Sequence, residues 1–248
     1  MFISIDGCDG CGKTTQIELL AQWLDRRGYP VLTCRDPGTT PLGEAVRELV
    51  LHRHDLRIDP RAEMLLYMAA RAQLVDEVIR PALAAGKIVL ADRYLLANVV
   101  YQGYGRGLDV AALWEVGRVA VAGVMPDLTI VLDVSPQMAA ARLARLRSGT
   151  SGGEKAEPGQ PEPPGCVPGS VGAEDSPAGV APASHRIPTS PPLDRLEQRG
   201  PAFQQRVREG YLTEAARHTH QMVVIDASAS IDAVHKAICG AVEQLLLR

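Results

Sequence analysis

The stretch from Gly7 to Thr14 combines residues whose types and spacing suit phosphate binding. It consists of Gly7, four further residues, and then Gly12-Lys13-Thr14. Glycines let consecutive backbone N–H groups turn inward around phosphate oxygens, and a helix N-terminus adds partial positive charge. A short apolar run precedes the stretch and a helical pattern follows it, which is the context that a phosphate-binding loop (P-loop) requires. We therefore expect a nucleoside triphosphate to bind here.

Single residues of the P-loop have separate expected roles. Lys13 would bridge the β- and γ-phosphates, and the hydroxyl of Thr14 would be a ligand of Mg²⁺. The residues that we expect to hold ATP are Gly7, Cys8, Asp9, Gly10, Cys11, Gly12, Lys13, Thr14 and Thr15.

Two of these residues, Cys8 and Cys11, form a Cys-x-x-Cys pattern. A zinc site needs further ligands, and the chain has no second pair of this kind. Redox chemistry is a second interpretation, because a helix N-terminus lowers the pKa of a nearby thiol. The simpler interpretation is that two small residues fill a tight loop.

The elements that must position this loop follow an alternating pattern of short apolar runs and helices. Short apolar runs alternating with helices predict βαβ units, which form a parallel sheet with helices on both faces. We expect a three-layer α/β/α fold with five central strands at residues 2–6, 31–34, 88–91, 128–134 and 222–225. The main helices are expected at residues 13–27, 60–85, 109–121, from 136 onward, and at 231–247.

One segment, residues 148–192, interrupts this pattern. It contains ten of the eighteen prolines of the chain and no aromatic residue. Such a composition buries too little apolar surface to offset the entropy of ordering, so we expect a disordered insertion. A strand and helices that complete the sheet follow it. Residues 1–248 are therefore expected to form a single P-loop domain that contains this insertion.

The overall composition indicates a globular protein without a strongly charged partner. Hydrophobic residues make up 46% of the chain, and the formal net charge is −3. This charge gives no reason to expect binding to nucleic acid, and no apolar run of about 20 residues predicts a membrane span. The N-terminus lacks the pattern of a signal peptide and the five cysteines are scattered, which favours a reduced, cytoplasmic protein.

Several separate blocks outside the P-loop resemble the thymidylate kinase family. The blocks are Arg35-Asp36-Pro37-Gly38-Thr39 with Gly43-Glu44 and Arg47; residues 65–73; Asp92-Arg93-Tyr94 with Tyr101-Gln102-Gly103; residues 126–134; and residues 194–197. The resemblance covers about residues 2–147 and 193–248. It implies a P-loop nucleoside monophosphate kinase, and it implies that the insertion lies in the lid that closes over ATP.

The resemblance also implies which residues bind the acceptor nucleotide. Tyr67 would stack on thymine, and Arg71, one helical turn later, would donate to a thymine carbonyl. Asp9 would accept from the 3′-hydroxyl, and Tyr101 would leave no room for a ribose hydroxyl. The full set of expected dTMP-binding residues is Asp9, Arg35, Pro37, Arg47, Tyr67, Arg71, Arg93, Ala97, Asn98, Tyr101 and Gln102.

The same resemblance implies which residues act in transfer. Lys13 and Arg93 would contact the transferred phosphate, and Asp92 would join Thr14 in holding Mg²⁺. The P-loop contains no arginine, which implies the subtype whose lid supplies the transition-state cations. Arg147 and Arg195 are the preferred pair for that role. The further lid arginines, which could also face solvent, are Arg142 and Arg145.

Three residues depart from the family pattern. Asp36 replaces a usual Glu and Thr39 follows Gly38 where a second Gly is common, which we expect to change little because the turn stays short and polar. Ala97 replaces a usual Ser and removes one hydroxyl, and Asn98 beside it could take over some hydrogen bonding. These departures concern base and sugar specificity rather than the type of reaction.

The expected reaction is transfer of the γ-phosphate of ATP to dTMP, giving ADP and dTDP for dTTP biosynthesis. Family membership implies a homodimer built on helix faces, including that of residues 109–121. One alternative is a kinase for another nucleoside monophosphate such as dUMP. Another is a nucleotide-binding regulator without catalysis, which the presence of Lys13, Thr14, Asp92 and Arg93 disfavours.

Overall fold

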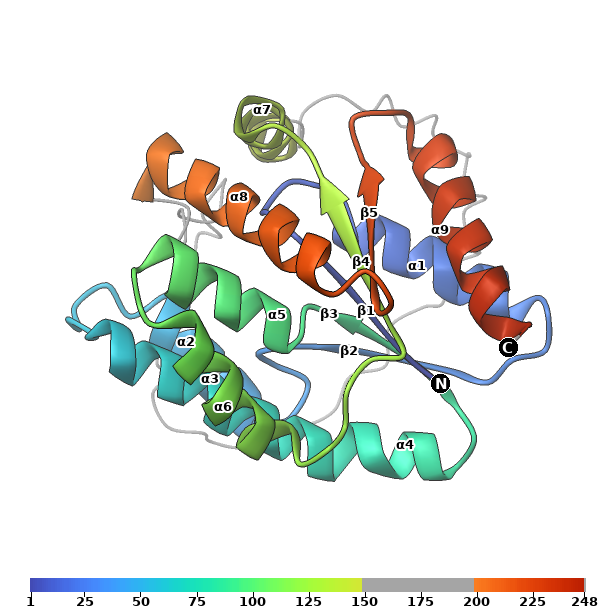
Figure 1. Cartoon of the computed structure of the whole chain (residues 1–248), viewed down its shortest axis with the longest axis horizontal. Coiled ribbons are helices and arrows are strands. Elements are labelled where there is room, and N and C mark those ends of the chain that lie inside the picture. The colour runs from blue at the N-terminus through green and yellow to red at the C-terminus, as the bar shows by residue number, and fades with distance from the viewer. Residues whose placement is uncertain (149–198, 248) are drawn as a thin grey trace, which may run out of the picture.

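A computed structural model of the chain describes residues 1–148 and 199–247 (Figure 1). Residues 149–192 of the predicted insertion and Arg195 lie outside the described residues, and so does the side chain of Arg147, whereas Ser148 is helical.

Five parallel strands form one sheet in the order β2-β3-β1-β4-β5, which confirms the predicted fold class. The central strand β1 pairs with β3 on one side, where Ile5 lies opposite Asp92. It pairs with β4 on the other side, where Gly7 lies opposite Leu132. The strands are β1 (Phe2–Gly7), β2 (Val31–Arg35), β3 (Ile88–Asp92), β4 (Leu128–Asp133) and β5 (Met222–Asp226).

Helices connect the strands and cover both faces of the sheet. Several of them begin with side-chain caps: in α2 and α3, for example, Thr40 accepts from the backbone of Gly43 and Asp59 accepts from that of Arg61. The helices are α1 (Lys13–Asp25), α2 (Pro41–Leu51), α3 (Pro60–Leu74), η1 (Val75–Ile79), α4 (Arg80–Ala84), α5 (Leu95–Asn98), η2 (Val99–Gly105), α6 (Val110–Val121), α7 (Pro136–Ser148), α8 (Pro201–Arg217) and α9 (Ile231–Leu246), where η marks a π-helical turn.

The helix expected over residues 60–85 has that extent but is not uniform. Its middle, η1, is wound as a π-helix, in which Arg80 donates to the carbonyl of Val75 five residues earlier. Pro81 follows at once and has no N–H, and its ring crowds the preceding turn. A wider turn before the proline accommodates both effects, which periodicity alone does not reveal.

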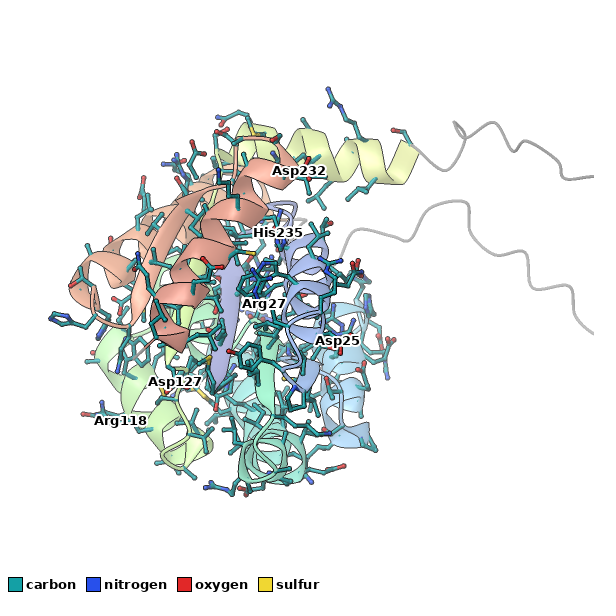
Figure 2. The ribbon with its side chains drawn as sticks, turned by 90° about the vertical axis from the view of Figure 1, so that its right-hand side faces the viewer. Asp25, Arg27, Arg118, Asp127, Asp232 and His235 are labelled. Atoms are coloured by element: carbon teal, nitrogen blue, oxygen red, sulfur yellow. The ribbon has the colours of Figure 1, made fainter. Side chains whose placement is uncertain are left out.

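Alternate residues of the strands face two separate cores, which produces the three layers. Ile3 and Ile5 of β1 pack in the cluster that includes α1 and α9, whereas Phe2 packs on the opposite face against Tyr94 and Val89. Figure 2 shows α1 and α9 side by side on the first face. The helices from α2 to α6, together with α8, cover the second face (Figure 1).

The order of the strands positions the functional residues. Chain connections leave the central strand β1 toward β2 and β3 on one side and arrive at β4 and β5 on the other. Parallel sheets of this kind bind ligands in the crevice at the carboxyl ends of the strands, where the order reverses. Gly7, Asp92 and Asp133 end β1, β3 and β4 at that edge.

None of the helices in the described ranges is long and apolar enough to cross a membrane.

Candidate active site

The P-loop leaves β1 at Gly7 and ends at the start of α1. Gly7, Gly10 and Gly12 have φ angles of 138°, 81° and 100°, which side chains rarely adopt. A Cβ atom on Gly7 would lie 2.5 Å from the carbonyl oxygen of Leu132 on the neighbouring strand. Glycine is therefore required at this point for the loop to leave the sheet.

The ammonium group of Lys13 lies inside this loop. Its Nζ donates to the carbonyl oxygens of Cys8 at 2.9 Å and of Gly7 at 3.2 Å. These carbonyls hold the lysine at the point where the loop backbone turns. A bound phosphate would offer stronger, charged acceptors to the same group.

Arg93 joins the P-loop to the elements that follow β3. It follows Asp92 directly and has a φ angle of 69°. Its guanidinium donates to the carbonyl of Gly7 at 2.8 Å and to the hydroxyl of Tyr211 at 3.1 Å. It also forms an ion pair with Asp9. This side chain is thereby held rigidly at the crevice.

Asp9 completes this cluster from the loop side. Tyr101 donates from its hydroxyl to the second carboxylate oxygen of Asp9 at 2.9 Å. Burial pushes the pKa of Asp9 upward, but the charges of Arg93 and Lys13 hold it below its ordinary value. Asp9 is therefore an ionised acceptor whose position is set by two side chains from outside the loop.

A small cavity of about 70 Å³ lies beside this cluster. All but one of the predicted dTMP-binding residues line it; the exception is Arg35, which lines a neighbouring cavity. Two residues that we did not predict, Asp36 and Leu51, also line it. The cavity is lined by Asp9, Asp36, Pro37, Arg47, Leu51, Tyr67, Arg71, Arg93, Ala97, Asn98, Tyr101 and Gln102.

Arg71 and Asp36 form a buried ion pair in the wall of this small cavity. The Nε atom of Arg71 lies 2.6 Å from Oδ2 of Asp36, and the side chains are 2% and 0% exposed. Burial raises the pKa of Asp36, and the guanidinium of Arg71 opposes this. Asp36 thus positions Arg71, which is more than the polar turn that we expected from its place after β2.

A chain of hydrogen bonds continues from Arg71 through the cavity wall. Arg71 donates to Oδ1 of Asn98 at 3.1 Å, and Nδ2 of Asn98 donates to Oε1 of Gln102 at 2.6 Å. Nε2 of Gln102 then donates to Oε1 of Glu63 at 2.9 Å. An arginine only donates and an ionised carboxylate only accepts, so the direction of the chain is determined at both ends.

Glu63 is a residue that our sequence reasoning missed. It is completely buried, and its second carboxylate oxygen lies 3.7 Å from Arg106 and 3.5 Å from Arg199. Its spacing contained a signal, since Glu63, Tyr67 and Arg71 follow one another at intervals of four on α3. Residues at this interval share one helix face.

A larger cavity of about 630 Å³ lies above the P-loop. Arg142 on α7 donates to the carbonyl of Ala227 at 2.8 Å, and Arg145 also lines the cavity. Arg35 reaches the same cavity and pairs with Glu44 at 3.0 Å. The lining consists of residues 9–16, Arg35, Asp36, Arg47, Asp92, Arg93, Arg142, Leu143, Arg145, Leu146, Ala227, Ala229, Ile231 and Val234.

Oxygen atoms suited to a hard divalent cation gather at the floor of this large cavity. The hydroxyl of Thr14 donates to Oδ2 of Asp92 at 3.3 Å. Asp6 lies below, completely buried, and neither of its carboxylate oxygens has a partner among the described residues. Burial raises the pKa of Asp6 to about 6. Hydroxyl and carboxylate oxygens are the ligands that Mg²⁺ prefers, so the residues fit such an ion.

The two cavities share part of their walls. Asp9, Asp36, Arg47 and Arg93 line both of them. A P-loop at the end of β1, beside a second cavity with an arginine at the junction, defines a P-loop nucleotide-binding protein of the α/β class.

Comparison with known proteins identifies the family. Residues 5–157 match the family model for thymidylate kinase. The chain is 38% identical to a thymidylate kinase of Caldanaerobacter subterraneus subsp. tengcongensis, over 99% of this chain and 96% of the relative. It is 40% identical to one of Solidesulfovibrio magneticus, over 99% of this chain and all of the relative.

A solved structure agrees with the sequence matches. The crystal structure of thymidylate kinase from Ehrlichia chaffeensis superposes with a TM-score of 0.65 at 26% identity, covering 98% of each chain. This chain therefore belongs to the thymidylate kinase family, as its sequence blocks predicted.

Proposed function

We propose that the protein is a dTMP kinase, which transfers the γ-phosphate of ATP to dTMP and releases ADP and dTDP. The observation that carries this proposal is the junction of the two cavities at Arg93 and Arg47. A triphosphate on the P-loop would extend its γ-phosphate toward the junction, and a monophosphate in the small cavity would approach it from the other side. The relatives named above carry the name of this activity.

In this proposal, the chain contributes positioning and positive charge. Phosphoryl transfer requires in-line alignment and cations on the oxygens where charge gathers. Lys13 and Arg93 would bind the transferred group from its two sides, and Arg35 and Arg47 would hold the acceptor phosphate. The attacking oxygen of dTMP is already ionised, so no side chain has to remove a proton.

Tyr67, Arg71 and Asn98 would bind the thymine base in the small cavity. Arg71 is already held by Asp36 and Asn98, so its direction toward a bound base is set in advance. Such pre-organisation reduces the entropy cost of binding. Tyr101, locked to Asp9 by its hydroxyl, would exclude a ribose 2′-hydroxyl by steric contact.

Thr14 and Asp92 would hold Mg²⁺, with Asp6 contributing through water. When bound, the ion neutralises charge on the β- and γ-phosphate oxygens.

We propose that arginines of the lid supply the positive charge that stabilises the transition state. Arg147 and Arg195 are still our preferred transition-state cations. Arg142 donates a hydrogen bond to the carbonyl of Ala227. Arg145 lines the larger cavity above the P-loop and would be the next choice for a transition-state cation.

We further propose a cytoplasmic homodimer that uses α6. Val119 on this helix is 81% exposed, while Leu113 and Val121 of the same helix are buried in the core. Family membership is the reason for this proposal, and a second copy would cover this side chain.

ADP release by purified protein with Mg-ATP tests this function. The acceptors dTMP, dUMP, dCMP, dGMP, UMP and the ribose analogue of dTMP are offered in parallel. We expect fast turnover on dTMP and poor turnover on the ribose analogue. Fast turnover on a different base would refute the base pocket, and ATP binding without any turnover would favour a regulator.

A matched pair of variants provides the control for this assay. Lys13→Met should abolish turnover, because the transferred phosphate loses its cation. Lys236→Met replaces an exposed lysine on α9, outside both cavities, and should keep the activity of the parent.

A further inference from the structure

We propose that Cys8 and Cys11 form a reversible disulfide inside the P-loop when the protein meets a hydroperoxide, and that this disulfide turns off ATP binding. The chemical part of this inference is independent of the acceptor nucleotide. The functional part rests on the proposed kinase activity.

The backbone places the two cysteines within disulfide range. The N–H of Cys11 donates to the carbonyl of Cys8 at 3.4 Å, which closes a four-residue turn. Such a turn brings its first and last Cα atoms to within about 7 Å. Disulfides join Cα atoms that are about 4.4 to 6.8 Å apart, so only a small backbone movement is required.

The two side chains also point to the same place. Both cysteines are buried in one apolar cluster, and a hydrogen bond joins their thiols. The sulfur of Cys11 packs against the backbone of Gly7, where a Cβ atom would come within 2.8 Å of it. The pair therefore faces inward under the loop.

The surroundings shift the pKa values of the two thiols in opposite directions. The hydrogen bond from Cys8 and the charge of Lys13, whose Nζ lies 3.8 Å from the sulfur, lower the pKa of Cys11 against the opposing effect of burial. Donating that hydrogen bond and being buried raise the pKa of Cys8. A reactive thiolate beside a protonated thiol is the arrangement of a redox-active Cys-x-x-Cys pair.

The reaction balances with a hydroperoxide as the oxidant. The thiolate of Cys11 attacks one peroxide oxygen, the O–O bond breaks, and Cys11 becomes a sulfenic acid. The hydroxide that leaves takes the proton of Cys8. The thiolate of Cys8 then attacks the sulfur of Cys11, the S–O bond breaks, and a second hydroxide leaves, which takes a proton from the solvent and becomes water. Each sulfur loses one electron, and the two peroxide oxygens gain two.

Cys11 is buried but lines the larger cavity above the P-loop, so we expect a small oxidant to approach the pair from the phosphate site. ATP would cover this route and hold the loop in its phosphate-binding shape. We therefore expect ATP to slow the oxidation.

The disulfide would disturb the residues that bind phosphate. It draws the two sulfurs from hydrogen-bond contact to about 2.0 Å. Asp9 lies between them in the turn, and Lys13 is bonded to the carbonyl of Cys8. A displacement of about 1 Å can reduce an enzymatic rate by roughly 100-fold. We expect at least a tenfold loss of ATP turnover on oxidation, with recovery in dithiothreitol.

Peptide mapping detects the disulfide directly. The chain has no Lys or Arg before Lys13, so trypsin releases both cysteines on the peptide 1–13. Cys34, Cys166 and Cys239 fall on three other peptides. After treatment of the full-length protein with hydrogen peroxide and alkylation, peptide 1–13 should be lighter by two hydrogens and carry no alkyl groups. Preincubation with Mg-ATP should slow this change.

Two serine variants separate the disulfide from other oxidation. Cys11→Ser should lose the modification, and whatever activity it retains should show no dithiothreitol-reversible loss. Cys239→Ser, on α9 and outside the loop, should form the disulfide and lose activity as the parent does. Binding of a fluorescent ATP analogue, measured beside turnover on dTMP, gives a readout that does not depend on the acceptor.

Two results would overturn the proposal. One is a peptide 1–13 that stays reduced while peroxide oxidises the other cysteine peptides. The other is full disulfide formation with unchanged binding of the ATP analogue. A reduced protein that binds ATP but does not turn over dTMP would instead refute the proposed function and leave the disulfide to be judged by mass and ATP binding.

Discussion

Gln102 donates from its Nε2 atom to Oε1 of Glu63 at 2.9 Å, and this bond anchors the hydrogen-bond chain in the wall of the acceptor cavity. Glu63 does not line the cavity itself. It nevertheless determines which end of each carboxamide faces its neighbour, because a carboxylate can accept hydrogen bonds but cannot donate them. The orientation of Asn98 follows, since its Nδ2 donates to Gln102.

Replacing Glu63 should therefore weaken dTMP binding from a distance. Glu63→Gln can donate as well as accept, so the direction of the chain is no longer set. We expect the KM for dTMP to rise on the order of tenfold, as for the loss of one hydrogen bond to a charged group, with kcat and the KM for ATP little changed. Steady-state kinetics with each substrate varied in turn would measure this.

The control for Glu63 is an exposed glutamate on another helix. Glu18→Gln on α1 changes an exposed side chain outside both cavities and should leave both KM values unchanged. If Glu63→Gln lowered only the melting temperature and left the KM for dTMP unchanged, its role would be structural alone.

Tyr101 allows steric exclusion to be separated from hydrogen bonding. Tyr101→Ala opens space beside Asp9, so turnover of the ribose analogue should rise relative to dTMP by on the order of tenfold. Tyr101→Phe keeps the ring and loses only the bond to Asp9, so its selectivity should remain close to that of the parent. The kcat/KM ratio for the two sugars is the measurement. Equal ratios in both variants would show that the ring does not exclude the ribose.

Arg93 is expected to need its forked shape as well as its charge. Its two terminal nitrogens contact Gly7, Asp9, Tyr101 and Tyr211 together, which an ammonium group cannot reproduce. Arg93→Lys should lower kcat by about 100-fold or more in steady-state assays with both substrates saturating. Arg26→Lys, at an exposed arginine directly after α1, serves as the control and should have no effect. A normal kcat in Arg93→Lys would mean that charge alone is sufficient.

Asp6 should make the stability depend on pH in a defined window. Burial raises its pKa from 3.8 to about 6, so the folded state binds this proton more tightly than the unfolded chain. As pH rises from about 4 to 6, the unfolded chain releases the proton first, and the free energy of unfolding falls by about 3 kcal/mol from this residue. Asp6→Asn should remove that part of the dependence.

Urea unfolding between pH 4 and 7 in the presence of a chelator would measure this difference. Asp25→Asn, an exposed residue at the end of α1 (Figure 2), should retain the slope of the parent. Parallel slopes for Asp6→Asn and the parent would contradict the assignment of the raised pKa to Asp6.

Features that depend on residues close together in the chain could be predicted from the sequence. The P-loop was predictable because glycines at positions 7, 10 and 12 permit φ angles that other residues avoid, and Lys13 lies beside them in the chain. The parallel sheet was predictable because short apolar runs alternate with helical patterns. All five strands lie within a residue or so of their expected positions.

The tertiary structure alone decided which distant side chains meet. Asp36 and Arg71 are 35 positions apart, and Glu63 and Gln102 are 39 apart. The local sequence around Asp36 or Glu63 does not predict which residue its carboxylate contacts, because the contact depends on how α3 packs against the segment after β2 and against η2. The π-helical turns are set in the same way, by a proline and by packing rather than by periodicity. Local geometry therefore specified the phosphate-binding loop, and long-range packing specified the wall of the acceptor cavity.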